Sequence, residues 1–436
     1  MHHRADTGTF FRYVLPAMAS QLLMGFFIIV DGFFIGRCLG DTGLAAINLL
    51  WPISAVILAT GLGIGTGGSV LFSAAHGAQD EARARTARTA ALVLLAAATV
   101  VLACTLWAAY PFLLRAFGAT GELYEPAAAY CRIAISLCGM QIFNGGLNPL
   151  LRAHGCTVQA MAARVAGLLC NIFLDWLFIM RLDWGMAGAA GATVAAQFLS
   201  AAMAAFFLFR QRVLPFRSGR PHISARTFVQ ILRIGVSPFG LSMSASILIM
   251  FHNWQSMAWG GASGVAAYAV VSYALGAAQP LLTGVAEGVQ PLMSFFRGSG
   301  DRGAEQKLLR MARRTVLIVS MVLFAGMTAS RGILPAAFGA SEHVADLCRS
   351  ALFLSALSLI PWGIVHLYAS YYYAVTEVRL ANLLIYGEPL VLTPALLFLL
   401  PVFWQLDGVW AALGTAECLL VLFIFFAEKR RKFTNA

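Results

Sequence analysis

Charged residues are scarce in this chain. Asp, Glu, Lys and Arg make up only 11% of its 436 residues, while 60% are hydrophobic. A soluble globular protein carries roughly 25% charged residues. The mean hydropathy is +0.78. This composition excludes a soluble globular domain and indicates an integral membrane protein.

Three other signals are missing from the sequence. No ten-residue alternation of apolar and polar residues marks the strands of a β-barrel. The N-terminal stretch MHHRADTGTFFRY is not followed by a short apolar core with a small-residue cleavage site, so we expect no removable signal peptide. The eight cysteines form no CxxC pair. They give no support to a zinc site or a disulfide framework, and we expect small buried side chains instead.

Long apolar runs recur from one end of the chain to the other. A run of about 20 residues crosses about 30 Å of hydrocarbon as a helix. We therefore expect an all-α membrane protein with twelve transmembrane helices, joined by short segments and without a soluble domain of any size. The predicted spans lie near residues 11–35, 44–73, 89–114, 127–151, 160–180, 186–209, 227–259, 262–296, 315–330, 347–373, 380–400 and 408–427.

The basic residues are distributed unevenly between the two sides of these spans. If the N-terminus is cytoplasmic, only six of the 30 basic residues fall outside the cell, namely Arg37, Arg115, Arg132, Arg181, Arg331 and Arg349. The positive-inside rule then predicts that both termini are cytoplasmic. The net charge of +11 is therefore a topology signal, and loops this short offer no surface for nucleic acid.

The two halves of the sequence correspond when one is shifted by 221 to 223 positions. The matches predict two six-helix bundles, residues 1–209 and 227–436, joined by a cytoplasmic linker at 210–226. Six helices per repeat give both bundles the same orientation, which is the parallel-repeat layout of secondary transporters around a central cavity. The matching stretches are Pro16 with Pro238, GLAA (43–46) with GVAA (264–267), SAAHGAQD (73–80) with SFFRGSGD (294–301), and FGAT (117–120) with FGAS (338–341).

Acidic residues inside the spans are candidates for function, because a charge is costly in lipid. No Lys lies in a span interior and the arginines cluster at span ends, so we expect these carboxylates to lack basic partners. Asp175 shares a helix face with Asn171, four residues earlier. Together with Asp31 and Thr193 they predict either a proton-holding network or oxygen ligands for a small cation such as Na⁺, with polar packing between helices as the alternative. The five acids are Asp31, Asp175, Glu287, Glu388 and Glu417.

Uncharged polar residues in other spans predict a substrate cavity, with packing against a neighbouring helix as the alternative. Asn144 and Asn148 again share a helix face. Glu417 lies near the end of its span, where it is expected to reach the interface, and isolated His252 and His366 are expected to serve packing. The glycines of GIGTGG (63–68) predict close helix packing rather than nucleotide binding, because no strand precedes them. The residues expected to line the cavity are Gln21, Gln141, Asn144, Asn148, Asn253 and Glu287.

The sequence resembles the multidrug and toxic compound extrusion (MATE) family over nearly its whole length. The resemblance is carried by the stretches LPAMASQLLMGFFIIVDGFFIGRCLG, LRAHGCTVQAMAARVAGLLCNIFLDWLFIMRLDWGMAGAAGATVAAQ, EGVQPLMSFFRGSGD and LPVFWQLDGVWAALGTAE. Within the family it is similar to the DinF-type branch, which places an aspartate fifteen residues after a proline in helix one.

This resemblance implies specific roles for several residues. Asp31, Asn171, Asp175 and Thr193 match the coupling-ion site, and Asn144 and Asn148 fall where the branch lines its substrate chamber. Helix one is expected to rearrange at Pro16. A second coupling site of the kind found in the NorM-type branch is not expected, because Asn253 replaces the acid in helix seven.

We therefore predict a secondary antiporter of the bacterial inner membrane that is not an enzyme. It would export small amphipathic or cationic organic compounds, driven by H⁺ or Na⁺ influx, as a monomer in the lipid bilayer and without a cofactor. A flippase for a lipid-linked or polyprenyl precursor is the first alternative; it would need a basic groove for phosphate. An intramembrane enzyme is the remote one, because it needs a nucleophile–base pair or a metal triad within a span.

Overall fold

The described part of the chain is entirely helical, with turns between the helices. The computed structural model describes residues 5–210, 224–338 and 340–434; the side chains of residues 26–29, 31–33, 41, 44, 45, 48 and 431–434 lie outside this description. The side chain of Asp31 and most of the linker predicted at 210–226 therefore lie outside the described residues. The division into bundles at 209 and 227 stays a prediction.

The N-terminal half contains six spans. Helix α1 (Thr7–Gly77) is a continuous run that holds two spans, because Gly40 breaks its helical geometry with φ 61° and ψ −156°. The other elements are α2 (Glu81–Ala116), η1 (Gly121–Leu123), α3 (Tyr124–Ser136), α4 (Cys138–Ala153), α5 (Thr157–Asp175), the π turn η2 (Trp176–Arg181) and α6 (Gly185–Arg210).

The C-terminal half repeats this order. Helix α7 (Ala225–Ser299) holds two spans on either side of Gly261, and α12 (Thr393–Thr434) is broken at Gln405. Between them lie α8 (Arg302–Ala329), η4 (Ser330–Gly332), α9 (Leu334–Ala337), α10 (Glu342–Ala374), α11 (Val378–Gly387) and the π turn η5 (Glu388–Leu392).

The observed helices confirm an all-α membrane protein with twelve spans. By length and composition alone, seven of the described helices cross a membrane, or eight when the bent pair α3 and α4 is taken as one span. The number is lower than twelve because α7 and the segment from Val378 to Arg430 are each taken as one, and because the first span of α1 and helix α8 are not counted. Helix α8 begins at Arg302, well before the predicted start at 315, because its first turns carry charged side chains that the apolar pattern did not include.

The backbone follows the predicted repeat. Residues with positive φ recur at a spacing of 221 to 222, as Gly40 with Gly261, Gln79 with Gly300, Gly155 with Thr376 and Asp183 with Gln405. The matching stretches SAAHGAQD and SFFRGSGD form the same turn. In each, a left-handed residue precedes an aspartate, Asp80 or Asp301, whose side chain accepts a hydrogen bond from the first turn of the next helix.

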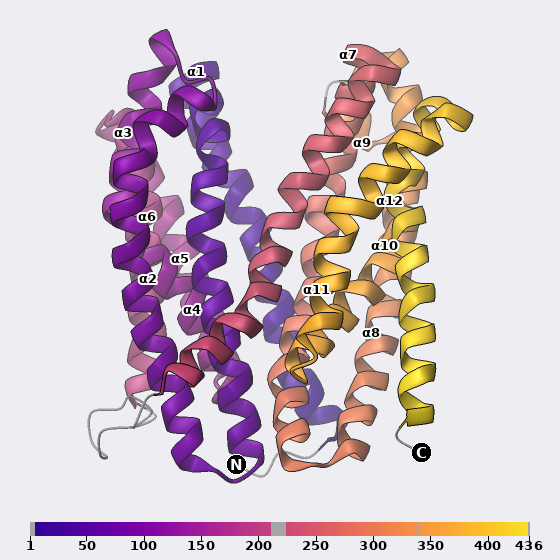
Figure 1. Cartoon of the computed structure of the whole chain (residues 1–436). Helices are drawn as coiled ribbons and strands as arrows, with labels where there is room; N and C mark the ends of the chain where they lie inside the picture. Colours follow the sequence, from indigo (N-terminus) through magenta and orange to yellow (C-terminus); the bar gives the residue numbers. More distant parts are fainter. Residues whose placement is uncertain (1–4, 211–223, 339, 435–436) are drawn as a thin grey trace.

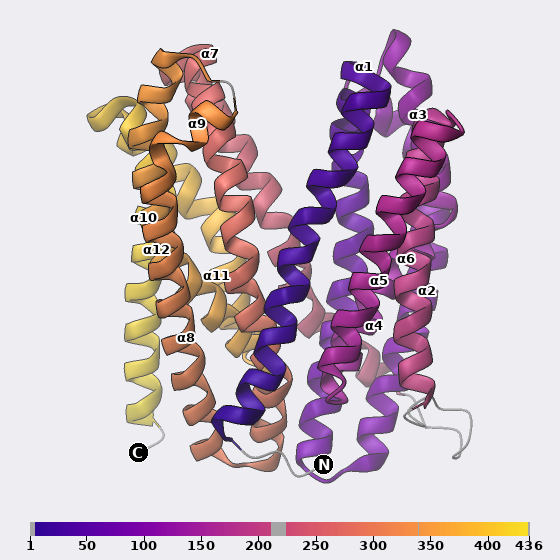
Figure 2. The same ribbon diagram turned by 180° about the vertical axis from the view of Figure 1, so that it is seen from behind.

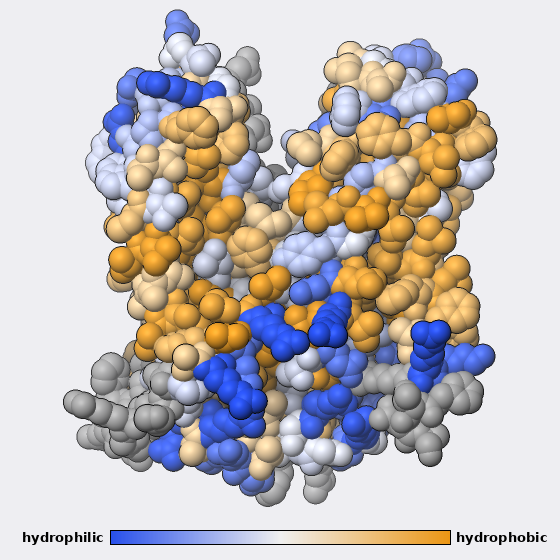
Figure 3. Space-filling model, in the orientation of Figure 1, coloured by the Kyte–Doolittle hydropathy of each residue, from blue (hydrophilic) through white to orange (hydrophobic). Residues whose placement is uncertain are grey.

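The two halves form a V whose arms meet at one end (Figure 1). The start of α1 and the end of α12 both lie at that closed end (Figures 1 and 2). A space-filling view shows a cleft between the arms that opens at the other end, with apolar side chains over the middle of both arms (Figure 3). Each arm has its own hydrophobic core, although Phe10 and Val14 of α1 join the core of the C-terminal half.

Glycines allow the helices of the two halves to cross closely at the closed end. A Cβ atom at Gly67 would lie 2.3 Å from the carbonyl oxygen of Ile231, and one at Gly288 would lie 2.8 Å from Cα of Val14. Gly67 belongs to the GIGTGG stretch and is equivalent to Gly288 in the repeat. Close packing therefore explains this motif, as predicted.

Candidate functional site

Three of the four predicted coupling residues lie buried in the N-terminal half. Asn171 and Asp175 of α5 are fully buried, and Thr193 of α6 is 8% exposed. Helices α5 and α6 pack against each other. Within the described part of the chain, neither the Asn171 amide nor the Thr193 hydroxyl has a hydrogen-bond partner. Buried polar groups in native structures are normally satisfied, so this region has capacity for a further polar ligand. That these residues act with Asp31 stays a prediction.

The backbone is irregular directly after Asp175. This residue ends α5, and the next six residues form the π turn η2. Such π turns are rare and frequently lie at functional sites. The turn ends before Asp183, which has a positive φ of 51°.

A polar network connects α4 with α6. The side-chain amide of Asn144 donates to Gln197, and the Ser200 hydroxyl donates to Oδ1 of Asn144 over 2.7 Å. Asn148 donates to the same Oδ1 over 3.2 Å. Asn144 and Asn148 therefore share a face, as predicted. Gln197 and Ser200 were not predicted, because single uncharged polar residues in an apolar helix carry only a weak sequence signal.

A pocket lies beside this network, between α1, α4, α5 and α6. Asn144 is the one predicted cavity residue that lines this pocket; Asn148 is 1% exposed and Gln141 is 5% exposed. Gln21 and Asn253 are partly exposed, and no contact ties them to the pocket within the described residues. Ser20 lines it and donates to the carbonyl of Pro16 over 2.8 Å. The lining residues are Ser20, Leu23, Met24, Asn144, Arg164, Gly167, Leu168, Ala196, Gln197 and Ser200.

An ion pair joins the two halves. Nη1 of Arg152, at the end of α4, lies 3.0 Å from Oε2 of Glu287 in α7, and the two side chains are only 5% and 11% exposed. The charge of Arg164, a pocket residue, also interacts with both. The expectation that the intramembrane acids lack basic partners is therefore wrong for Glu287. Sequence spacing could not show this, because the partners are 135 positions apart on different helices.

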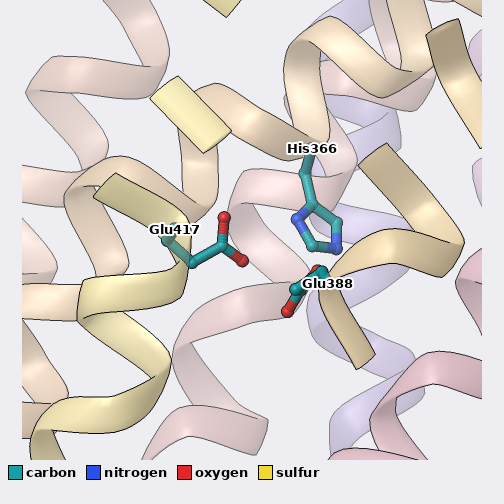
Figure 4. A group of neighbouring side chains, drawn as sticks. All are labelled: His366, Glu388 and Glu417. Atoms are coloured by element: carbon teal, nitrogen blue, oxygen red, sulfur yellow. The ribbon is translucent and has the colours of Figure 1, made fainter. Parts of the chain in front are cut away.

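The structure also corrects two expectations in the C-terminal half. Glu417 is fully buried and so does not reach the interface. His366 is not isolated, because it lies beside Glu388 and Glu417 (Figure 4). His252 does pack as expected, with its ring stacked on Tyr268 at a centroid distance of 5.1 Å.

Comparisons with known proteins agree with this arrangement. The family model MatE matches residues 16–177. The multidrug export protein MepA of Staphylococcus saprophyticus is 23% identical over 413 residues, covering 94% of this chain and 90% of that protein. MepA of Staphylococcus aureus is 22% identical over 415 residues, with 94% and 90% covered.

Solved structures match almost the entire chain. The outward-facing conformation of a multidrug resistance MATE family transporter superposes with a TM-score of 0.91 at 24% identity, covering 97% of this chain and 95% of that one. The chain has the fold of the MATE transporters. A MATE structure in the straight conformation matches with a TM-score of 0.91 at 23% identity, and one in the bent conformation with 0.88 at 24%, each covering 97% of this chain and 95% and 94% of the other. The MATE resemblance is thereby supported, and the DinF-type branch stays a prediction.

Proposed function

We propose that this multi-pass membrane protein is a secondary antiporter that exports small amphipathic or cationic organic compounds. The observation that carries the proposal is the shape of the molecule. Its two halves enclose a cleft that opens at one end (Figure 3), and they are joined at the other by the Arg152–Glu287 pair and by close glycine contacts. Rocking the halves about these contacts would expose the cleft alternately to each side of the membrane.

The orientation proposed from the basic residues makes this an outward-facing state. The closed end carries the start of α1 and the end of α12, which the positive-inside rule places in the cytoplasm. The protein would then release substrate from the state seen here. We propose that it lies in a bacterial inner membrane. We also propose that it works as a monomer, because a single chain supplies both halves of the cleft.

The coupling ion is proposed to bind at Asp31, Asn171, Asp175 and Thr193. Support comes from the burial of Asn171 and Asp175. It also comes from the Asn171 amide and the Thr193 hydroxyl, which have no hydrogen-bond partner within the described residues. Entry of H⁺ or Na⁺ would neutralise the carboxylates and allow α1 to rearrange near Pro16. One proton is worth about 2.3 kcal/mol per 100 mV of membrane potential. A tenfold concentration of a neutral substrate costs about 1.4 kcal/mol, so one ion per substrate is sufficient there. One-for-one exchange with a monovalent cation moves no net charge, so a tenfold gradient of the coupling ion has to supply the same amount, about 1.4 kcal/mol.

One observation favours the alternative, a flippase for a lipid-linked precursor. Arg164 lines the pocket and Arg152 lies nearby between the halves, so basic groups are present where a phosphate would bind. The Glu287 carboxylate compensates part of that charge, which is why we place export of organic cations first.

The test uses purified protein in liposomes with an imposed pH or sodium gradient and a fluorescent cationic dye. We expect gradient-driven accumulation of the dye, which collapses when the coupling gradient is removed. Dye movement that ignores both gradients, together with movement of a fluorescent lipid phosphate, would favour the alternative.

A further inference from the structure

Three titratable side chains meet in the core of the C-terminal half. His366 comes from α10, Glu388 from the first residue of the π turn η5, and Glu417 from α12. One ligand atom from each lies within 4.8 Å of the others, and the three side chains point toward one another (Figure 4). They are 6%, 2% and 0% exposed. A protein seldom collects two acids and an imidazole in its interior without a function for them.

The neutral ring of His366 keeps one nitrogen lone pair. Its Nδ1 lies 3.2 Å from the carbonyl oxygen of Trp362. A carbonyl can only accept, so Nδ1 carries the proton of the neutral ring and Nε2 keeps its lone pair. The ring stacks on Trp362 at a centroid distance of 3.5 Å, which fixes its orientation. Such an outer hydrogen bond is the usual support of a metal-binding histidine.

The two glutamates have no counter-charge within the described residues. Other buried acids of this half are paired with arginine: Glu305 lies 3.6 Å from Arg297 and Glu287 lies 3.0 Å from Arg152. In the same described part, neither carboxylate oxygen of Glu417 nor Oε1 of Glu388 receives a hydrogen bond from a residue outside this pair. Buried charges are normally paired or coordinate metals.

We propose that His366, Glu388 and Glu417 form a binding site for a divalent transition-metal ion of the Mn²⁺ or Zn²⁺ class. Two carboxylates and a neutral imidazole carry a charge of −2, which a divalent cation neutralises. Mg²⁺ and Ca²⁺ are bound through oxygen, whereas a set with an imidazole nitrogen suits Mn²⁺ and Zn²⁺. The π turn η5 begins at Glu388 and Pro389 follows, and such turns frequently lie at functional sites.

The test measures metal binding to chelator-treated protein in detergent, with Mn²⁺ as the probe. Binding is followed by the loss of the free-Mn²⁺ electron paramagnetic resonance signal. The reference protein and all variants carry His2→Ala and His3→Ala, because these adjacent histidines at the N-terminus could bind the metal themselves. We expect one equivalent of bound Mn²⁺, and an affinity at least tenfold lower in Glu388→Gln and in Glu417→Gln. His252→Gln is the control, because His252 has the same local environment as His366 but lies outside the proposed site. The Nδ1 atom of His252 also bonds a backbone carbonyl four residues earlier, and its ring also stacks on an aromatic ring.

A second readout needs no substitution in the site. Pulsed electron paramagnetic resonance of Mn²⁺ bound to protein labelled with ¹⁵N-histidine should show hyperfine coupling to one imidazole nitrogen. Absence of Mn²⁺ binding, glutamine variants that bind Mn²⁺ as tightly as the parent protein, or a bound ion without a coupled nitrogen would each overturn the proposal. Because the readout is binding, it is independent of whether the protein exports drugs.

Discussion

Ser69 and Gln290 occupy equivalent positions in the two halves, 221 residues apart, and their side chains form a hydrogen bond of 3.3 Å. The pseudo-twofold axis of the repeat therefore passes between these two residues. The same reciprocity holds nearby: Gly77 contacts the backbone of Phe295, and its equivalent Gly298 contacts the backbone of Ala74, the equivalent of Phe295. The closed end of the cleft is thus a symmetric interface between the repeats.

Widening this interface should destabilise the conformation seen here. A Cβ atom at Gly298 would lie 1.9 Å from the carbonyl oxygen of Ala74. Overpacking of this kind costs about 1–3 kcal/mol. We expect Gly298→Ala to lower the population of the cleft-open state, measured as distances between spin labels on the two arms. Gly276→Ala in the same helix meets nothing within 4 Å and should leave the distance distribution unchanged; equal distributions in both variants would count against the interface.

The ion pair between the halves should respond asymmetrically to removal of its partners. Glu287→Gln leaves Arg152 and Arg164 facing each other without an acid, whereas Arg152→Gln leaves Glu287 with Arg164. Removing one partner of a buried pair costs about 3–5 kcal/mol, so Glu287→Gln should destabilise the cleft-open state by more than Arg152→Gln. Thermal unfolding in detergent and the same spin-label distances measure this.

A surface pair provides the comparison. Asp346 and Arg349 are about 60% exposed, and exposed pairs contribute about 0–1 kcal/mol. Asp346→Asn should therefore change neither readout appreciably. Similar losses in Glu287→Gln and Asp346→Asn would show that the inter-half pair does not hold the closed end.

Acid should weaken the fold through His154. This residue lies just beyond α4, where burial lowers its pKa to about 4 against the ordinary 6.5, although the hydrogen bond of Nδ1 to the Leu150 carbonyl opposes that shift. Between these two pH values the unfolded chain takes up a proton that the folded chain resists, so the free energy of unfolding falls as the pH drops from about 7 toward 4. We expect the melting temperature of His154→Gln to fall less over this range.

The matched control for that experiment is His343→Gln. His343 lies on the surface at the start of α10, so its replacement should leave the pH dependence of the melting temperature as in the parent protein. If the curves of all three proteins coincide, His154 does not contribute to the acid sensitivity.

Arg164 should influence which substrates are accepted. Arg164 lines the pocket together with Asn144 and Gln197. Removing a positive charge should favour cations, and a tenfold change in apparent affinity corresponds to about 1.4 kcal/mol. We expect Arg164→Gln to lower the concentration of cationic dye needed for half-maximal transport by up to about this factor, with the opposite change for an anionic dye. Equal shifts for both dyes would exclude an electrostatic role.

The sequence predicted the features that depend on local pattern and on the repeat. Apolar runs located the twelve spans, and the offset of about 221 seen in the sequence recurs in the structure as the spacing between the helix breaks at Gly40 and Gly261. Asn144 and Asn148 share a face because helical spacing requires it. These properties follow from one segment, or from two segments related by symmetry.

Contacts between distant helices could not be predicted in this way. The Arg152–Glu287 pair and the approach of His366 to Glu388 and Glu417 depend on how α4, α7, α10 and α12 rotate as they pack. None has a counterpart in sequence spacing, and the last cluster has no equivalent acids at the matching positions of the first half. The sequence therefore predicts the single polar residues but not their partners.

The proposed coupling depends most directly on the carboxylates of the N-terminal half. The decisive measurement is gradient-driven export of a cationic dye from proteoliposomes by the wild type, Asp31→Asn, Asp175→Asn and the surface control Asp346→Asn. We predict that both Asp31→Asn and Asp175→Asn lose at least about 90% of the coupled flux, a tenfold change that corresponds to about 1.4 kcal/mol, while Asp346→Asn keeps it. Full coupled export by either the Asp31→Asn or the Asp175→Asn protein would contradict this prediction.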